Sequence, residues 1–305
     1  MLIAVTGATG FVGRHIVRTL LGRGHRVRAL VRNPARAAAL AAQGVELVPG
    51  DLADQQALST LLDGVPAVIH LVGIILERGS STFDAVHVEG TRAVVAAARG
   101  LGVRRFVHIS ALGARPDPDA TQYQRTKWQA EEIVRAAGIA SVVLRPSVIN
   151  GPESEPIRTL ARLHRWLPVV PVFGQATFPM QPVWIEDVAA AFALAAEHDE
   201  SRGTLELGGP DVLTFSQFVR AIGRASGHPR PLVHVPLAMV RILARVGDPF
   251  GPLAPITSSQ LRMLVEGTAT PANAIETVFG IRPLAFEEGL RRFLGGRQKH
   301  QTRGQ

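Results

Sequence analysis

The chain has 305 residues, of which 46% are hydrophobic, 19% charged and 5% aromatic, a composition typical of a folded globular protein and not of a disordered or fibrous one. Cysteine is absent, which excludes disulfides, thiolate metal sites and a cysteine nucleophile. The formal net charge of +8 arises largely at the C-terminal end, because five cationic side chains and no acidic one follow Glu288.

This location of the charge argues against nucleic-acid binding, since the Arg residues elsewhere are not interleaved with aromatic side chains. We interpret residues 295–305 as a basic disordered tail that is either simply solvated or in weak, salt-sensitive contact with anionic membrane, helped by the apolar and basic segment from Leu237 to Val246. The longest apolar run, residues 65–76, is far shorter than the about 20 residues of a spanning helix. With a first strand starting at Leu2, the sequence predicts no secretory signal and a cytoplasmic protein, peripheral to the inner membrane face if the tail binds lipid.

Residues 1–150 alternate short apolar runs with helical segments, the pattern of parallel strands joined by crossover helices. We expect strands at residues 2–6, 26–31, 45–49, 67–72, 106–110 and 141–144. Helices are expected at residues 11–21, 35–42, 55–62, 86–99 and 122–137, and each ends near a Gly that can adopt the left-handed cap. Because the strands are continuous apolar runs, helices should cover both faces of the sheet. The sequence therefore predicts an α/β fold with a Rossmann-type doubly wound parallel sheet.

After about residue 145 the alternation loosens, Pro and Gly become frequent, and helices are expected only at residues 185–197, 215–226 and 286–294. We therefore predict a nucleotide-binding domain at residues 1–150, to which some later segments return, and a smaller C-terminal substrate-binding or lid region at residues 151–294. The oligomeric state is not predicted.

A GxxGxxG motif, formed by Gly7, Gly10 and Gly13, lies between the first strand and the first helix. The early glycines let the backbone approach a pyrophosphate, Gly13 lets the helix pack closely on the sheet, and the helix start offers free N–H groups. This context predicts a dinucleotide site. Beside the three glycines, we expect it to be lined by Thr9, Phe11 and Val12, by Asp51 and Leu52 after the third strand, and by Leu71, Val72 and Gly73 after the fourth. A helix N-cap role is the alternative for Asp51 or Asp54.

The second strand ends at Val31, Arg32 and Asn33, with no acidic residue in reach. In this fold an acidic side chain at that position binds the ribose 2′-hydroxyl of NAD, whereas an Arg accepts the 2′-phosphate of NADP. Arg32 therefore favours NADP(H), although Arg is abundant in this chain and NAD(H) stays open as the alternative.

Tyr123 is the only Tyr of the chain, and Lys127, four residues later, is one of only two Lys. On a helix both side chains share one face. A phenol is a poor acid or base near neutrality, and an adjacent ammonium favours phenolate and lowers the phenol pKa. The pair predicts a proton donor, with a surface helix that carries a Tyr and a Lys as the bland alternative.

With TGATGFVG at residues 6–13 and YQRTK at residues 123–127, the chain resembles the extended short-chain dehydrogenase/reductases. Within them it is most similar to the atypical group related to the NADPH-binding accessory subunit of respiratory complex I, through HISALGA at 108–114, LRPSVINGP at 144–152 and PVWIEDVA at 182–189. The resemblance covers about residues 1–230. It implies Tyr123 as general acid/base, Lys127 as ligand of the nicotinamide ribose, and a segment from Arg145 through Pro146 to Val148 that borders the nicotinamide.

Two positions depart from the family pattern. The catalytic Ser usually lies one or two residues beyond Ser110, where this chain has Ala111 and Leu112, and the Asn expected before VxGT is His87. Ser110 either substitutes as the group that polarises the substrate oxygen or only lines the cofactor site. No metal-ligand spacing, GxSxG or Walker motif is present, so we predict neither a metal site nor a hydrolase.

Two functions from different classes stay open. One is an NADPH-dependent oxidoreductase or epimerase-like enzyme that acts on a carbonyl, quinone-like or sugar-derived small molecule. The other is a catalytically silent NADP(H)-binding accessory or sensor module associated with a respiratory complex or quinone biosynthesis. The retained Tyr and Lys favour the enzyme, and the missing Ser favours the silent module.

Overall fold

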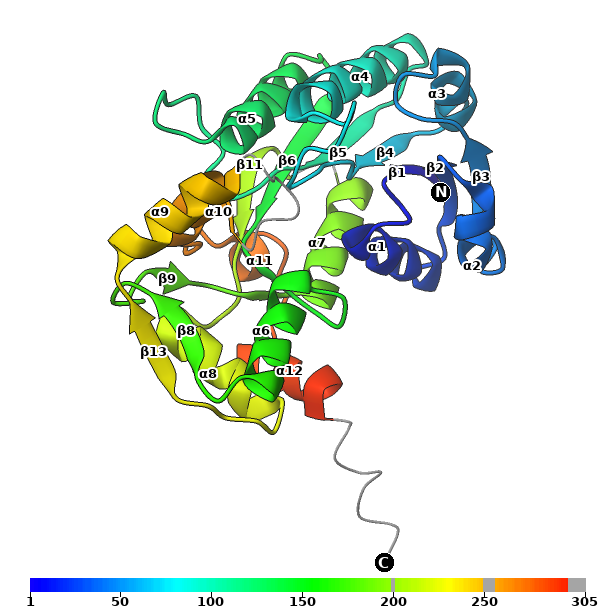
Figure 1. Cartoon of the computed structure of the whole chain (residues 1–305). Coiled ribbons are helices and arrows are strands. Elements are labelled where there is room, and N and C mark those ends of the chain that lie inside the picture. Colours follow the sequence, from blue (N-terminus) through cyan, green and yellow to red (C-terminus); the bar gives the residue numbers. More distant parts are fainter. Residues whose placement is uncertain (199–200, 249–255, 296–305) are drawn as a thin grey trace, which may run out of the picture. The chain divides into compact units, whose positions relative to one another are not determined.

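The computed structural model describes residues 1–198, 201–248 and 256–295, and the chain forms two compact units (Figure 1). Unit 1 comprises Met1–Pro146, Glu186–Leu207 and Ala272–Ile281, and unit 2 comprises Ser147–Ile185, Gly208–Pro271 and Arg282–Gln305. Nearly all of the expected basic tail, residues 296–305, lies outside the described residues.

Unit 1 is built on a seven-stranded sheet in the order β11-β6-β5-β4-β1-β2-β3, in which all neighbouring strands are parallel. Its strands are β1 (Leu2–Thr6), β2 (Arg26–Val31), β3 (Glu46–Pro49), β4 (Ala67–His70), β5 (Arg105–Ile109), β6 (Ala140–Pro146) and β11 (Gly203–Leu207). The predicted Rossmann-type fold is confirmed, and each of the six expected strands is present within two residues of its predicted bounds. The strand order reverses between β4 and β1, and ligands of such sheets bind at the carboxyl ends of the strands beside that point.

Helices cover both faces of this sheet (Figure 1). On one face α3 (Gln55–Leu62), α4 (Gly90–Gly100) and α5 (Gln122–Arg135) bury a core that includes Leu58, Val94, Phe106 and Val134. On the other face lie α1 (Phe11–Gly22) and α7 (Ile185–Glu197), which are joined by a hydrogen bond of 2.9 Å between His15 Nδ1 and Glu186 Oε1. The remaining helices of unit 1 are η1 (Pro34–Ala37), α2 (Ala38–Ala41), η2 (Asp84–Glu89) and α11 (Ala274–Thr277).

Two of the expected helices are each divided in two. The helix predicted at residues 35–42 is the 3₁₀ turn η1 followed by α2, and the helix predicted from residue 86 begins as η2, a π-helical segment that leads directly into α4. The π-helix is rare and occurs frequently at functional sites. It is the segment that carries His87.

The described part of unit 2 combines three short strand pairs with helices. The pairs are β7 (Ile149–Asn150) with β10 (Val183–Trp184), β8 (Val170–Phe173) with β13 (Leu232–Val235), and β9 (Pro179–Met180) with β12 (Leu213–Thr214). Its helices are α6 (Glu155–Trp166), α8 (Phe215–Ala225), α9 (Leu237–Gly247), α10 (Ser258–Glu266) and α12 (Phe286–Leu294). Aromatic stacking organises the core, with the rings of Phe218 and Phe286 4.8 Å apart. Among the described residues, no helix is long and apolar enough to cross a membrane.

Candidate functional site

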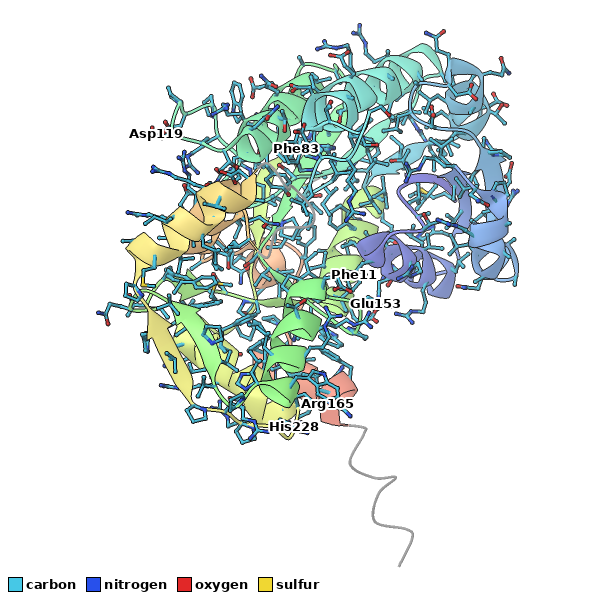
Figure 2. All side chains as sticks on the ribbon, viewed as in Figure 1. Phe11, Phe83, Asp119, Glu153, Arg165 and His228 are labelled. Atoms are coloured by element: carbon cyan, nitrogen blue, oxygen red, sulfur yellow. The ribbon has the colours of Figure 1, made fainter. Side chains whose placement is uncertain are left out.

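The glycine motif forms the turn between β1 and α1. Gly7 has a φ of +77°, which favours Gly, and a Cβ built on Gly13 would lie 2.2 Å from the Gly7 carbonyl oxygen. Gly10 is the N-cap of α1 and offers no side-chain cap, and no acidic residue occupies the first turn. Phe11, the first residue of α1 (Figure 2), packs edge-on against His15 at 5.7 Å. A helix start with exposed Thr9 and Gly10 and with no acidic residue in its first turn fits a pyrophosphate.

Replacing Gly13 by Ala should therefore distort the turn. The new Cβ would also lie 2.8 Å from Ala8 Cα, so α1 must move away from β1. We expect a lower melting temperature and no thermal stabilisation by NADPH, measured by a thermal shift assay with and without cofactor. Gly22→Ala is the matched control, because nothing lies within 4 Å of its Cβ position. An unchanged response of Gly13→Ala to NADPH would contradict the assignment of this turn.

The residues expected around the adenosine lie at the ends of β2 and β3. Arg32 directly follows β2 and is exposed. Asp54 is the N-cap of α3 and accepts a hydrogen bond of 3.0 Å from Ala57 N, as the alternative interpretation expected. Asp51 instead closes a short turn by accepting from Ala53 N at 2.9 Å, and it is exposed. Leu52 packs against α4, since its Cδ1 would lie 2.6 Å from a Cβ built on Gly90.

The segment after β4 joins the glycine turn to α5. Leu71 N donates to Thr6 O at 3.1 Å, and a Cβ built on Gly7 would lie 3.2 Å from Leu71 Cβ. Val72 follows as a half-buried residue. At the end of this segment, a Cβ built on Gly73 would lie 3.4 Å from Lys127 Nζ. The structure therefore brings the glycine turn, residues 71–73 and Lys127 together at the carboxyl ends of the strands of unit 1.

Tyr123 and Lys127 lie in the first two turns of α5, whose start is fixed by a capping box between Thr121 and Gln124. Lys127 is only 3% exposed, and its Nζ donates a hydrogen bond of 2.8 Å to the carbonyl of Ile109 at the end of β5. The half-buried Tyr123 ring packs edge-on against Phe83, with the ring centroids 5.8 Å apart. The alternative that Lys127 is an exposed residue of a surface helix is therefore wrong.

Burial dominates the proton equilibria of this pair. It raises the pKa of Tyr123 to about 12 and lowers the pKa of Lys127 to about 8, while Glu131 counteracts the second shift. The expectation of a lowered phenol pKa is therefore wrong for the chain alone, in which desolvation of the phenolate is the cause of the shift. The phenol is protonated near neutrality, which is the form that can donate a proton.

His87, the departure from the family pattern, ties the segment after β4 to α5. Its Nε2 accepts from Ile74 N at 3.0 Å, and its Nδ1 lies 2.9 Å from Thr126 Oγ1. Its ring also packs edge-on against Tyr123 at 5.5 Å. Burial first and the charge of Lys127 second lower the pKa of His87 to about 3, so the ring is neutral. The sequence marked His87 only as a departure; its role as an anchor of the site is visible only in the structure.

Two further buried histidines lie on β4 and β5. His70 bonds Thr6 Oγ1 at 2.7 Å and Thr91 Oγ1 at 3.1 Å, and burial, with a smaller effect of the Lys127 charge, lowers its pKa to about 3. His108 stacks on His70 at 5.4 Å, and neither of its nitrogens has a hydrogen-bond partner in the part of the chain that the structure describes. Burial and then the charge of Lys127 hold the pKa of His108 well below its usual value. The sequence pattern did not single out either residue.

Ser110 directly follows β5 and is 4% exposed. Its N donates to Leu144 O at 2.7 Å, but its hydroxyl has no partner among the described residues. Pro146 O accepts from Leu112 N at 3.4 Å, which places the end of β6 beside the loop after β5. Val148 belongs to unit 2 and packs against the core of that unit. The structure thus groups Ser110 and Pro146 at one sheet edge of unit 1.

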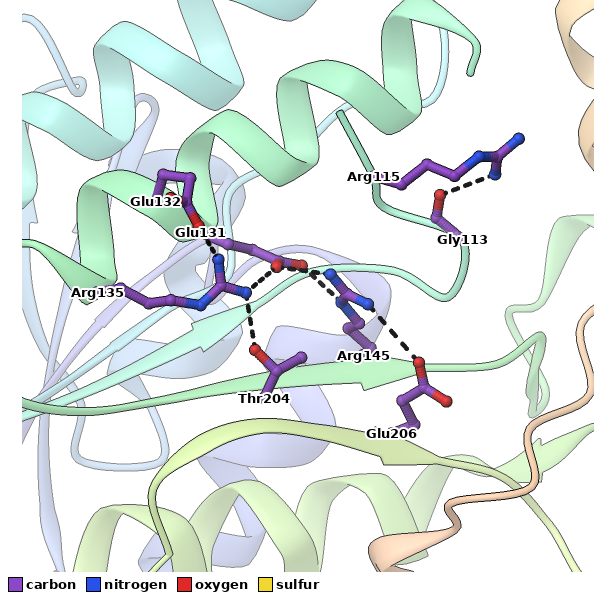
Figure 3. Close-up of polar contacts among 8 residues, drawn as sticks. All are labelled: Gly113, Arg115, Glu131, Glu132, Arg135, Arg145, Thr204 and Glu206. Carbon is purple, nitrogen blue, oxygen red and sulfur yellow. Dashed lines mark hydrogen bonds and ion pairs between the residues drawn. The ribbon is translucent and has the colours of Figure 1, made fainter. Parts of the chain in front are cut away.

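An ionic network secures α5 against β6 and β11 (Figure 3). The fully buried carboxylate of Glu131, one turn beyond Lys127, accepts from Arg145 Nε at 2.8 Å and from Arg145 Nη2 at 2.7 Å. Arg135 adds a second cation to Glu131 at 2.5 Å, and Arg145 also pairs with Glu206 at 3.6 Å. The side chain of Arg145 thus connects α5, through Glu131, with β6 and, through Glu206, with β11.

Known proteins share both the sequence pattern and the fold of this chain. A family model described as NAD(P)H-binding matches residues 7–166, which is slightly more than half of the chain. A ceramide reductase from Caulobacter vibrioides is 36% identical over 237 residues, covering 77% of this chain and 74% of the relative. The chain belongs to the extended short-chain dehydrogenase/reductase family. It is thus an NAD(P)H-binding member of that family, as the Gly and Tyr-Lys motifs predicted.

Two other relatives have names that indicate different roles. Sterol demethylase protein B from Methylococcus capsulatus is 32% identical over 279 residues and covers 82% of both chains. A mitochondrial NADH dehydrogenase 1 alpha subcomplex subunit from Arabidopsis thaliana is 31% identical over 223 residues, which cover 70% of this chain but only 55% of the subunit. The predicted similarity to the complex I accessory group is confirmed.

A solved UDP-glucuronic acid 4-epimerase from Bacillus cereus, in complex with UDP-glucuronic acid and NAD, has the same fold. It superimposes with a TM-score of 0.74 at 18% identity, covering 97% of this chain and 100% of the epimerase. At this identity the likeness shows the fold and says nothing about the substrate of this chain.

Proposed function

We propose that this protein is an NADPH-dependent oxidoreductase that reduces a carbonyl group of an apolar small molecule. The observation that carries the proposal is the convergence of the glycine turn, Gly73 and Lys127 in unit 1, with Tyr123 one helical turn before Lys127. A phosphate-binding turn without a proton donor would serve binding alone, whereas this edge holds a protonated phenol beside a buried amine.

Each site residue has a distinct proposed role. When bound, the cofactor would supply a hydride. Tyr123 would donate its phenolic proton to the substrate oxygen, and Lys127 would hold the ribose hydroxyls of the cofactor with the donors that its bond to Ile109 O leaves free. The unpartnered hydroxyl of Ser110 would polarise the substrate oxygen in place of the usual Ser, or would only line the cofactor site.

Two observations support an apolar substrate in place of a sugar. The relatives above 30% identity include proteins named for ceramide and sterol chemistry. Unit 2 contains two open hollows of about 450 and 350 Å³, and their walls are mainly apolar. The residues are Phe173, Gly174, Gln175, Ala176, Thr177, Phe178, Pro179, His234, Val235, Pro236, Leu237 and Val265. We propose that these hollows receive the apolar part of the substrate.

The proposed cofactor-binding and substrate-binding regions follow the domain boundaries that we predicted from the sequence. The cofactor would bind to residues 1–150 and the later segments that return to unit 1, and residues 151–294 would supply the substrate region. We propose a cytoplasmic location, because the chain has no cysteine and its proposed reaction consumes a reduced nicotinamide.

A catalytically silent NADP(H)-binding module is the second candidate. Ala111 and Leu112 occupy the positions of the usual catalytic Ser, and the similarity to the Arabidopsis NADH dehydrogenase subunit favours this function. Such a module would retain NADPH through purification and gain thermal stability from it, without oxidising it in the presence of any carbonyl or quinone. A substrate screen that follows NADPH absorbance separates the two candidates.

The preference for NADPH is expected to depend on Arg32. Its guanidinium can pair with the 2′-phosphate, a charge-assisted contact worth about 1.5 to 3 kcal/mol, or roughly tenfold or more in affinity. Titration of wild type and Arg32→Ala with NADPH and NADH measures the effect, and Arg32→Ala should lose the difference. Arg26→Ala, an exposed Arg at the other end of β2, is the matched control. Equal affinities of the wild type for both cofactors would remove the argument.

A further inference from the structure

Helix α9 in unit 2 presents two separate apolar faces. One is buried, where Val240 and Ala244 pack with Leu261 of α10. The other is solvent-exposed and follows the spacing i, i+3, i+4, i+7 along a single stripe. It consists of Met239 (62% exposed), Ile242 (64%), Leu243 (55%) and Val246 (61%). Large apolar side chains exposed in a contiguous stripe mark an interaction surface.

The charges of α9 are all positive. Arg241 and Arg245 are exposed, and no acidic residue occurs between Leu237 and Gly247. At 3.6 residues per turn, the two Arg lie between the buried face and the exposed stripe, along one edge of the stripe. Within the described ranges neither guanidinium has an ion pair, whereas Arg158 and Arg162 on α6, with the same spacing, both pair with Glu155. The stripe is therefore bordered by two guanidinium groups, those of Arg241 and Arg245, that are available to bind anions.

We propose that α9 docks unit 2 on the surface of an anionic lipid bilayer. The stripe would insert at the boundary between headgroups and acyl chains, and Arg241 and Arg245 would extend to the lipid phosphates. A bilayer matches both observations at once, since it offers an apolar interior beneath a layer of negative charge. A stable contact between two copies would instead place four Arg at the rim of one apolar interface, and the acidic C-cap of α9, Asp248, already accepts a hydrogen bond of 2.8 Å from Ser258 N.

The hollows of unit 2 strengthen the choice of lipid. Leu237, the first residue of α9, lines both hollows, beside Phe178, Pro179 and Val265 in the smaller one. An acyl chain that leaves the bilayer along α9 would thus meet an apolar wall. This link to the substrate rests on the proposed function, but the docking surface itself is tested without turnover.

Co-sedimentation of the full-length protein with vesicles tests the docking. With phosphatidylcholine vesicles that contain about a quarter phosphatidylglycerol, the wild type should pellet, and it should do so about tenfold less with phosphatidylcholine alone or at high salt. Ile242→Gln/Leu243→Gln and Arg241→Gln/Arg245→Gln should each weaken binding about tenfold or more. Arg158→Gln/Arg162→Gln and Val212→Gln, an exposed Val of unit 2 outside α9, should pellet as the wild type does.

A second measurement places α9 in the bilayer. The chain has three Trp of its own, so the emission of Met239→Trp is compared with that of the wild type. On addition of the anionic vesicles, the additional emission of Met239→Trp should shift to the blue and be quenched by brominated acyl chains. A chain that ends at Gly295 separates the contribution of the predicted basic tail, because binding through α9 should persist without it.

Equal pelleting of the wild type and both α9 variants would overturn the proposal. So would a dimer in analytical ultracentrifugation that Ile242→Gln/Leu243→Gln converts to monomer without any vesicle binding, since a second copy would then cover the stripe. Oxidation of NADPH with a water-soluble carbonyl should be unchanged in the α9 variants. Vesicle binding without any reductase activity would refute the proposed function and leave the docking surface standing.

Discussion

Replacement of Tyr123 by Phe should lower kcat by a factor of about 10² to 10⁴ and leave NADPH affinity nearly unchanged. The substitution removes only the hydroxyl, so the edge-on contacts of the ring with Phe83 and His87 persist and α5 keeps its position. With a pKa of about 12, the phenol holds its proton at neutral pH and can release it to a substrate oxygen as negative charge develops there. Steady-state kinetics and a fluorescence titration with NADPH measure the two quantities.

Lys127→Ala is the contrasting variant, because it should impair cofactor binding and rate together. Its Nζ lies at the same edge as Gly73 and is anchored to Ile109 O, so its loss removes a donor from the cofactor site itself. Gln129→Ala, an exposed position on the same helix, should behave as the wild type. Turnover that survives unchanged in Tyr123→Phe would refute the role of Tyr123. An absence of turnover across broad panels of carbonyls and quinones would favour the silent module.

The fold of unit 1 could be predicted because its signals are local. Continuous apolar runs and regularly spaced Gly residues are enough to predict six strands and the doubly wound class. The seventh strand, β11, was missed. Its sequence, Gly203–Leu207, is not a continuous apolar run, and it pairs with β6 across some 60 residues of chain. Helices α9 and α10 were missed for a similar reason: the Pro- and Gly-rich sequence around them hides an amphipathic pattern whose partner is another short helix.

The candidate site likewise has some features that the sequence predicts and others that only the structure reveals. The glycine motif and the Tyr-Lys pair were readable from spacing and composition, and family membership confirms the NAD(P)H-binding prediction. The roles of individual side chains stay proposals. The sign of the Tyr123 shift could not be read from the sequence, because a neighbouring charge is visible in a motif whereas desolvation depends on everything packed around the phenol. The anchors of Lys127 and His87 involve Ile109 and Ile74, whose contribution is a backbone group and leaves no trace in the residue type.

The free energy of unfolding should fall steeply with pH in mild acid because of the buried histidines. His70, His87 and His108 are neutral in the folded chain, with a pKa of about 3 for the first two and well below the usual value for the third, whereas in the unfolded chain each titrates at about 6.5. As pH falls below 6.5, the unfolded state binds more protons than the native state, so stability decreases by about 1.4 kcal/mol per pH unit for each His. While the pH stays above the native pKa values, three such groups give about 4 kcal/mol per unit, so a stability of about 5 kcal/mol, the low end of the ordinary range, is exhausted at about pH 5.

Urea unfolding followed by circular dichroism at a series of pH values measures this slope. His108→Phe should reduce the slope by roughly a quarter to a third between pH 6 and 4.5, because His70, His87 and His108 have the largest shifts and His164, whose pKa burial also lowers, adds a smaller part. The change breaks no hydrogen bond in the described part of the chain and preserves a ring against His70. His198→Phe is the matched control, because the side chain of His198 is 64% exposed. Below about pH 4.5 the paired carboxylate of Glu197, whose pKa is held at about 2 chiefly by Arg23, adds its own loss in the same direction, so the His contribution is read above that pH. A free energy of unfolding that stays constant from pH 7 to 5 would show that these histidines accept protons in the folded chain, and the assignment of neutral rings to His70, His87 and His108 would then be wrong.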